Sequence, residues 1–159
     1  MRRRYSSQIA NDLIEYMNVN NLTYQFNQDD GIIELNAATH AKISTVQFLI
    51  LVHAWGYTSL GCVNLAAQEA VRDEIIEYFT FANYNAIIGC FEFNIATGKI
   101  RYKVTVDCDG CAPSMKVFSH VLIVTLQMYR KFEDHLLRIL IGAETAAEAI
   151  AQIQAERKN

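Results

Sequence analysis

The fold is decided by the stretch Ala86–Asp107, AIIGCFEFNIATGKIRYKVTVD, in which two alternating segments flank a short polar loop. Alternation of apolar and polar residues with a period of two is typical of β-strands that bury one face. The apolar faces of the two segments hold Ile87, Gly89, Phe91 and Phe93, and Ile100, Tyr102, Val104 and Val106. The opposite face of the second segment holds Lys99, Arg101, Lys103 and Thr105. One apolar and one charged face predict a hairpin in a sheet that is covered by helices on a single side.

The register of this hairpin follows from parity, because a shift of one residue turns a whole strand over. A three-residue loop would pair Phe93 with Arg101 and mix the two faces. A four-residue loop over Ile95–Gly98 keeps the faces separate, pairing Phe93 with Ile100, Phe91 with Tyr102 and Glu92 with Arg101. Gly98 then supplies the positive φ that the end of such a turn requires.

The segments before this hairpin alternate in the same way or repeat with helical spacing. They predict a helix over 7–18 with Ser6 or Ser7 as its N-cap, and a hairpin of 22–27 and 33–35 that turns at Asp29-Asp30-Gly31. The segment Thr45–Val52 is apolar throughout, which predicts a strand covered on both faces that lies centrally or at an interface. Residues 57–63 are interpreted as an irregular or short extended connection.

Three further helices are predicted, over about 64–82 with Asn64 as its cap, over 114–141, and over 143–156 in the C-terminal stretch 142–159. The order is therefore helix, three strands, helix, two strands and helix, with a short helix at the end. Strands and helices in blocks, without alternation, indicate an α+β domain built on an antiparallel sheet, here of five strands. At 159 residues a single domain over 1–159 is expected.

The long helix predicted over 114–141 has more apolar residues than one core face requires. The excess gathers at Val121–Leu126, and the helix would be about 40 Å long at 1.5 Å per residue. This surplus predicts that part of the helix packs on a second copy of the chain.

The composition excludes several classes of protein. The net charge is −3, and nucleic-acid binding needs clustered Lys and Arg, so no nucleic-acid partner is expected. The longest apolar runs fall well short of the roughly 20 residues of a membrane span, so no membrane association is expected either. Four cysteines without a secretory signal predict reduced thiols in a cytoplasm.

The chain resembles the YbjN family, bacterial proteins described as candidate sensory transduction regulators. The residues that carry the resemblance are Tyr78–Asn85, Gly89–Phe93, Thr97–Lys103 and Leu140–Gly142 with the Ala/Glu-rich segment after it. The resemblance implies a fold similar to that of type III secretion chaperones, and a dimer-forming, non-enzymatic binding or regulatory module. It implies no catalytic residue, because the family has no agreed active site.

One motif has chemical promise, the pair Cys108 and Cys111 in Cys-Asp-Gly-Cys. Two thiols at this spacing can bind zinc, or act as a redox pair at a helix N-terminus that lowers a thiol pKa. Zinc needs two more ligands, and the possible completions lack ligand-like spacing: Cys62, Cys90, His40 and His120. A thioredoxin-like site would need a βαβ pattern, which is absent. The alternative is an Asp-Gly turn that happens to be flanked by cysteines.

The remaining polar candidates have structural explanations. Cys62 and Cys90 lie among apolar neighbours as expected of small core residues, and His53 on an apolar strand suits a hydrogen-bonded histidine of the core or an interface. His120 and His135 are about four helical turns apart and cannot share a ligand. Asp29 and Asp30 suit a turn, and the pair Asp107 and Asp109 lacks a partner base or nucleophile. Four aromatic residues suit the core or an interface: Trp55, Tyr57, Tyr84 and Tyr102.

These observations leave three hypotheses about function. The first is a non-enzymatic homodimeric binding module, chaperone-like or regulatory, that engages a polypeptide. The second is a zinc- or thiol-dependent protein that uses Cys108 and Cys111. The third, an enzyme with a small-molecule pocket, has no sequence feature behind it, and we predict no catalytic residue, no cofactor site and no metal site.

Overall fold

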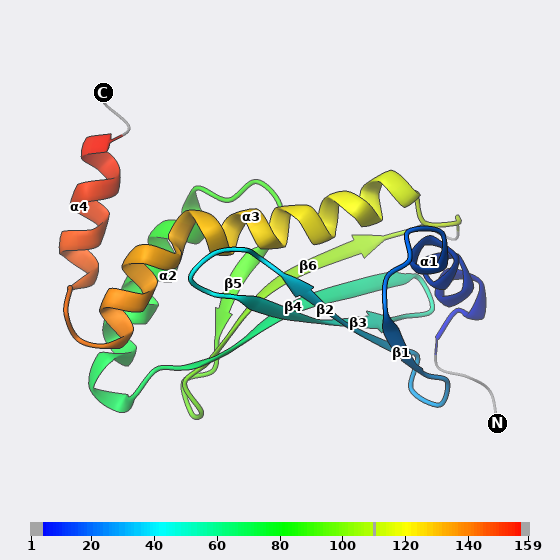
Figure 1. Cartoon of the computed structure of the whole chain (residues 1–159), viewed down its shortest axis with the longest axis horizontal. Coiled ribbons are helices and arrows are strands. Elements are labelled where there is room, and N and C mark those ends of the chain that lie inside the picture. Colours follow the sequence, from blue (N-terminus) through cyan, green and yellow to red (C-terminus); the bar gives the residue numbers. More distant parts are fainter. Residues whose placement is uncertain (1–4, 110, 157–159) are drawn as a thin grey trace.

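The computed structural model describes residues 5–109 and 111–156. Within them the chain is an α+β protein with four α-helices and one antiparallel sheet of six strands, in the order β1-β2-β3-β4-β6-β5 (Figure 1). The strands are β1 (Tyr24–Asn27), β2 (Ile32–Ala38), β3 (Thr45–Val52), β4 (Gly56–Ala66), β5 (Cys90–Phe93) and β6 (Lys99–Asp107). The helices are α1 (Ser7–Val19), α2 (Arg72–Tyr84), α3 (Met115–Leu140) and α4 (Ala146–Glu156), and a 3-10 turn η1 (Glu69–Val71) precedes α2.

The hairpin predicted from Ala86–Asp107 is formed by β5 and β6, and its register is confirmed. The observed pairs are Phe93 with Ile100, Phe91 with Tyr102 and Glu92 with Arg101. Gly98 has a φ of +70°, and its N–H donates to the Asn94 carbonyl at 2.7 Å, which closes the four-residue loop. The hairpin forms one edge of the sheet, where β6 pairs with β4 on its inner side.

The prediction of five strands is wrong, because the segment interpreted as an irregular or short extended connection is the long inner strand β4. Toward the helices β4 presents Tyr57, Ser59 and Gly61, which lack the aliphatic alternation that marks a strand. Gly61 is needed for close packing, since a Cβ at this position would lie 2.4 Å from the Thr125 methyl group of α3. Small residues therefore build this strand where a helix approaches it closely.

The helix predicted from Asn64 begins eight residues later, at Arg72. Strand β4 continues to Ala66, and the Ala67 N–H donates to the Gly98 carbonyl at 2.9 Å. This bond to the loop between β5 and β6 keeps the backbone extended through residues whose spacing suited a helix. Asn64 lies exposed near the end of the strand and caps no helix.

Strand β3 takes the central place predicted for it, between β2 and β4, but the chain covers only one of its faces. The covered positions Val46, Phe48, Ile50 and Val52 are all buried. On the opposite face Thr45 and Gln47 are exposed, and Leu49 and Leu51 are half-buried. Continuous apolarity therefore overstated how much of this strand the chain itself would bury.

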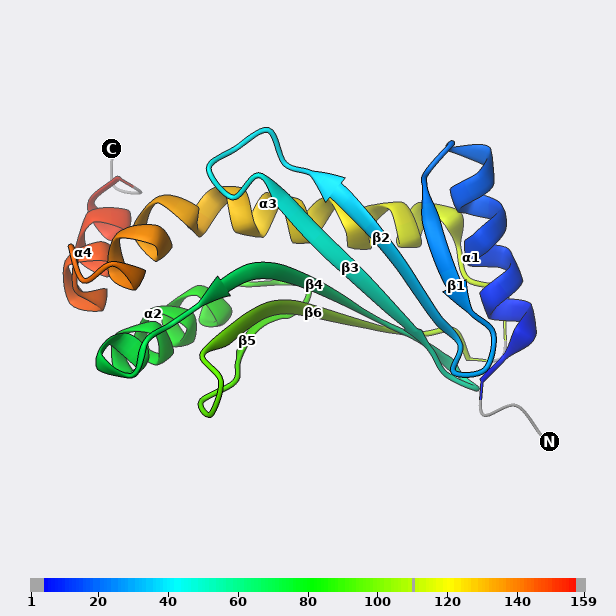
Figure 2. The ribbon, with the colours of Figure 1, turned by 60° about the horizontal axis from the view of Figure 1, so that its bottom comes forward.

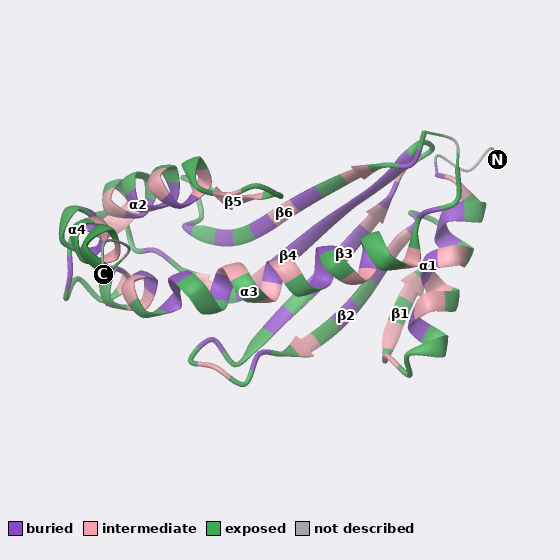
Figure 3. Ribbon diagram, turned by 90° about the horizontal axis from the view of Figure 1, so that it is seen from above, coloured by how far each residue is buried: buried purple, intermediate pink, exposed green. Residues whose placement is uncertain are grey.

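The four helices lie on one side of the sheet, as predicted. Helix α3 runs along this side, with α1 near its beginning and α2 and α4 near its end (Figures 1 and 3). The Tyr129 hydroxyl of α3 donates to the Gly61 carbonyl of β4 at 2.8 Å, and the Tyr78 hydroxyl of α2 donates to the Phe132 carbonyl of α3 at 3.0 Å. These buried bonds fix α3 against both the sheet and α2.

Most of the surplus apolar surface predicted for α3 is buried within the chain itself. Val121, Leu122 and Thr125 belong to the core or are enclosed by it, because α3 contacts β4, β6, α1 and α2 along its length. Val117 and Ile123 stay 44% and 48% exposed. The surface expected to pack on a second copy is therefore much smaller than the sequence indicated.

Candidate functional site

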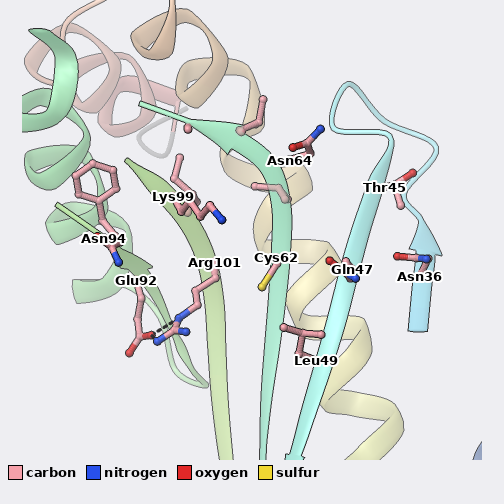
Figure 4. Close-up of a pocket in the computed structure, with 15 residues that line it drawn as sticks. Asn36, Thr45, Gln47, Leu49, Cys62, Asn64, Glu92, Asn94, Lys99 and Arg101 are labelled. Atoms are coloured by element: carbon pink, nitrogen blue, oxygen red, sulfur yellow. Dashed lines mark hydrogen bonds and ion pairs between the residues drawn. The ribbon is translucent and has the colours of Figure 1, made fainter. Parts of the chain in front are cut away.

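The helix-free face of the sheet holds a groove where β3 and β4 separate. Gln47 and Cys62 form the last pair between these strands, and beyond Cys62 the pairing of β4 with β6 is irregular up to Ala66. Figure 2 shows β4 bending away from β3 toward α2. The space left between them has a volume of about 1100 Å³, and we call it the open-face groove (Figure 4). It is lined by Asn36, Thr45, Gln47, Leu49, Cys62, Val63, Asn64, Leu65, Ala66, Glu92, Phe93, Asn94, Lys99, Ile100 and Arg101.

One row of paired residues crosses the groove from strand to strand. Adjacent partners in the sheet are Asn36 with Gln47, Gln47 with Cys62, Cys62 with Arg101, and Arg101 with Glu92. All five side chains therefore lie on the helix-free face, and Figure 4 shows them arranged from β2 to β5. Neighbouring strands are about 4.8 Å apart, so the row is about 19 Å long.

Uncharged polar side chains dominate one side of the groove. Asn36, Gln47 and Asn64 are exposed, and their carboxamides make no hydrogen bond with the part of the chain that the structure describes. Asn94 differs, because its side-chain oxygen accepts from the Ala96 and Thr97 N–H groups at 3.0 Å and so belongs to the loop. Three carboxamides are thus available to a ligand, each with two donor hydrogens and an acceptor oxygen.

Charged side chains occupy the other side of the groove. Glu92 accepts from Arg101, whose Nη2 lies 2.6 Å from Oε2, and from Lys103. Burial would raise the pKa of Glu92, but the hydrogen bonds from Lys103 and Arg101 outweigh it and hold the pKa below its usual range. Lys99 has no carboxylate partner among residues 5–109 and 111–156. Two cations against one carboxylate give the groove one positive charge in excess.

Cys62 lies on the floor of the groove and not in the core, so the expectation of a core cysteine is wrong for this residue. Its Sγ lies 3.9 Å from the Leu60 carbonyl oxygen. Burial raises the pKa of the Cys62 thiol, and the nearby Arg101 and Lys99 offset only part of that rise. The Cys62 thiol is therefore protonated at neutral pH, which makes it a poor nucleophile. Cys90 is likewise half-buried on the helix-free face, opposite Lys103.

The Cys108 and Cys111 motif forms a turn. The Cys111 N–H donates to the Cys108 carbonyl at 2.7 Å, and the Cys108 N–H donates to the Trp55 carbonyl at 2.9 Å. Cys108 is buried, Cys111 is exposed, and Gly110 between them lies outside the described residues. Burial raises the pKa of the Cys108 thiol, and Asp107 and Cys111 add to the rise. This is opposite to the shift that a reactive redox thiol needs.

No group of three or more His, Cys, Asp or Glu side chains that could hold a metal occurs within residues 5–109 and 111–156. The possible completions of a zinc site do not gather at the motif: Cys62 and Cys90 lie on the helix-free face, and His40 and His120 are exposed at the loop after β2 and on α3. The structure does not favour zinc binding at Cys108 and Cys111.

The other candidate residues have structural roles. Nε2 of His53 lies 2.9 Å from the Thr58 hydroxyl, and its ring stacks on Trp55, so the prediction of a hydrogen-bonded histidine is confirmed. Nδ1 of His135 lies 2.9 Å from Oε2 of Glu144, which links α3 to the segment before α4.

The two acid pairs belong to turns. Asn27 accepts from the N–H groups of Asp29 and Asp30, and Asp107 accepts from the N–H of Asp109 at 2.8 Å. The four aromatic candidates divide, with Tyr57 and Tyr102 in the core and Trp55 and Tyr84 exposed.

Sequence reasoning missed the groove, although one signal for it was present. Gln47 interrupts the apolar run of β3, and Asn36 and Glu34 occupy the same face of β2. Polar residues at alternate positions of inner strands indicate a face that meets water. The volume of the groove could not be inferred, because it depends on the separation of β3 from β4.

Exposed apolar side chains gather where α2 leads into β5. Tyr84 is 91% exposed and Ile87 98% exposed, and Ile88 lies beside them in the chain. The adjacent outer edge of β5 is protected by Asn83, whose Oδ1 accepts from the Phe91 N–H at 2.7 Å and whose Nδ2 donates to the Phe91 carbonyl at 3.0 Å. One carboxamide here replaces the peptide group of a neighbouring strand.

None of the helices within residues 5–109 and 111–156 combines the length and the apolar character needed to cross a bilayer.

The fold and the groove define a class of protein, an α+β protein whose antiparallel sheet has one face covered by helices and one face open. A scan of the sequence against known protein families finds no match. A search of curated proteins also finds no match.

The fold itself is similar to that of YbjN from E. coli, described as a candidate transcription regulator. The crystal structure of YbjN matches with a TM-score of 0.58 at 5% sequence identity, over 80% of this chain and 92% of YbjN. At this identity the likeness shows the fold alone. The chain therefore has a YbjN-like fold, in agreement with the resemblance of its sequence motifs.

Proposed function

We propose that this protein is a non-enzymatic, homodimeric binding module, regulatory or chaperone-like, that holds a polypeptide partner in the open-face groove. The observation that carries the proposal is the groove itself, about 1100 Å³ in volume and lined by three carboxamides that make no hydrogen bond with the described residues. These exposed groups are hydrated in the free protein, and a polypeptide main chain, which presents donors and acceptors at regular intervals, can replace that water.

The chemistry of the groove supports binding over catalysis. Its titratable lining consists of Cys62, Glu92, Lys99 and Arg101. The thiol is protonated at neutral pH, and the carboxylate is held by Arg101 and Lys103. None of the described residues that line the groove is a histidine, so the groups present do not form a pair of nucleophile and base. The four free cysteines in the described chain support a cytoplasmic setting for this function.

The homodimer is the second part of the proposal, and we assign its contact to the corner of α2 and β5. Tyr84, Ile87 and Ile88 fall within five residues, and two of them are more than 90% exposed. Apolar side chains clustered in this way on a protein surface mark interaction sites. A two-fold contact would bring the same cluster of both copies together.

Sedimentation equilibrium at micromolar concentration tests the homodimer. We expect a dimer for the unaltered chain and a monomer for Ile87→Asp, because an aspartate would be buried without a partner. The matched control is Ile141→Asp, at another exposed isoleucine, and it should leave the dimer intact. A monomer at all concentrations for the unaltered chain would refute the dimer.

Binding to a cellulose-bound peptide library tests the groove. Gln47→Trp fills the groove from its floor and should abolish binding to the peptides that the unaltered protein retains. The matched control is Gln127→Trp, at an exposed glutamine of α3 on the other side of the sheet, and it should leave binding unchanged. Equal binding by the two variants would exclude the groove as the site.

A further inference from the structure

We infer that the open-face groove takes an acidic polypeptide segment in an extended conformation, about six residues long. This inference rests on the proposed function and names the class of its ligand. It follows from three observations: carboxamides that can read a main chain, an excess of positive charge at one end of the groove, and the length of the row of residues that crosses it.

The first observation is a precedent inside the molecule. Asn83 pairs with the N–H and the carbonyl of Phe91 at once, so one carboxamide satisfies an extended residue of β5. Asn36, Gln47 and Asn64 offer the same group at the groove, and neither donor nor acceptor is used within the described chain. Such groups bind an extended main chain without regard to its side chains.

The second observation is charge. The protein carries a net charge of −3, whereas Lys99 and Arg101 against Glu92 leave the groove positive. Arg101 already binds Glu92, but Lys99 has no carboxylate within residues 5–109 and 111–156. An incoming carboxylate at this end would pair with Lys99 and with the donors of Arg101 that Glu92 leaves unused. Among the described residues that line the groove, a basic segment would find one carboxylate, Glu92, which two cations already hold.

The third observation is size. The row from Asn36 to Glu92 crosses five strands and is about 19 Å long, which an extended chain at about 3.3 Å per residue spans with about six residues. We assign the acidic segment to another protein, because the positive charge of the groove complements an acidic partner.

Fluorescence anisotropy with three labelled eight-residue peptides tests the inference. One alternates Val and Glu, the second Val and Lys, and the third Val and Gln. We expect the Val/Glu peptide to bind at least tenfold more tightly than the Val/Gln peptide, and the Val/Lys peptide to bind more weakly than both. Raising the salt concentration should reduce the preference for Val/Glu, since exposed charges are screened.

Lys99→Glu should reduce the affinity for the Val/Glu peptide at least tenfold and improve binding of the Val/Lys peptide. The matched control is Lys116→Glu, which makes the same change of charge at an exposed position near the start of α3. It should leave the order of the three peptides unchanged. Equal losses in the two variants would mean that only the net charge of the protein matters, and would overturn the inference.

The possible outcomes separate this inference from the proposed function. If the three peptides bind equally and Gln47→Trp weakens them all, the preference for acidic segments is refuted and the groove remains a polypeptide site. If no peptide binds, or Gln47→Trp has no effect, both are refuted. A labelled 20-nucleotide DNA that binds more tightly than the Val/Glu peptide and is lost in Lys99→Glu would assign the groove to nucleic acid and overturn the inference.

Discussion

The two faces of the sheet are made by alternate residues of the same strands, yet they differ in almost every property. On β3, Phe48 and Ile50 lie on the face that the helices cover and are fully buried, whereas Thr45 and Gln47 lie on the opposite face and are exposed. The helix-covered face fills space with aromatic and aliphatic side chains. The open face presents carboxamides that make no hydrogen bond with the described residues, and charged side chains that pair with one another. The covered face thus supplies the core, and the open face is the one to which we assign recognition.

The largest expected effect is on the covered face. Phe48→Ala removes a fully buried ring and should lower the free energy of unfolding by about 4 kcal/mol. Gln47→Ala, one residue away on the open face, should change it by less than about 0.5 kcal/mol. Urea unfolding followed by circular dichroism measures both. Similar losses for the two variants would show that the open face is also part of the core, and would end the division of roles.

The next effect tests why β4 is built from small residues. A Cβ at position 61 would lie 2.4 Å from the Thr125 methyl group and 3.2 Å from a Val46 methyl group. Gly61→Ala should therefore lower the free energy of unfolding by about 2 kcal/mol, as overpacking does.

Thr125→Ser provides the control for this prediction. It removes the clashing methyl group and keeps the hydroxyl that donates to the Val121 carbonyl. In the Gly61→Ala background it should recover part of the loss. If the serine instead adds to the destabilisation, close contact between α3 and β4 is not the reason for the glycine.

This same strand marks the limit of what the sequence could predict. The register and the loop of the β5–β6 hairpin were predicted correctly, because each of its strands alternates and Gly98 restricts the loop. The predicted start of its first strand was wrong, because β5 begins only at Cys90 and Ile87, expected on the apolar face, is 98% exposed. Strand β4 was missed because its covered positions are chosen to fit α3, and periodicity carries no information about a distant helix. Its continuation to Ala66 was missed for a similar reason, since the bond between Ala67 and Gly98 joins segments that are far apart in sequence.

The open-face groove could be predicted only in part. The polar residues Asn36 and Gln47 were visible as interruptions of apolar strands. Their position beside Arg101 requires the strand order β2-β3-β4-β6, and this order was out of reach once β4 was interpreted as a connection. Cys108 and Cys111 attracted attention in the sequence because of their spacing, but the structure places them in a turn, and Cys62 and Cys90 lie apart from them on the helix-free face.

A smaller effect concerns the outer edge of β5, where the Asn83 side chain binds the main chain of Phe91. Asn83→Ala removes both side-chain bonds to Phe91 and should lower the free energy of unfolding by about 1–2 kcal/mol. Asn83→Asp keeps the acceptor for the Phe91 N–H and loses the donor to its carbonyl, so an intermediate loss is expected. Thermal and urea unfolding measure both. An effect of aspartate as large as that of alanine would contradict the role of the Phe91 N–H bond.

The smallest effect is on the open face, where charge contributes to stability only modestly. The pKa of Glu92 is lowered in the folded protein, so its contribution is present above its unfolded value of about 4.3 and disappears as the pH falls through the lower folded value. Glu92→Gln should therefore cost less than about 1 kcal/mol at pH 7, as expected of a partly exposed ion pair. The difference between the variant and the unaltered protein should shrink toward zero between about pH 5 and pH 3. Urea unfolding at several pH values measures it. A difference that grows on acidification would mean that folding raises the pKa of Glu92, and would contradict its ion pairs with Arg101 and Lys103.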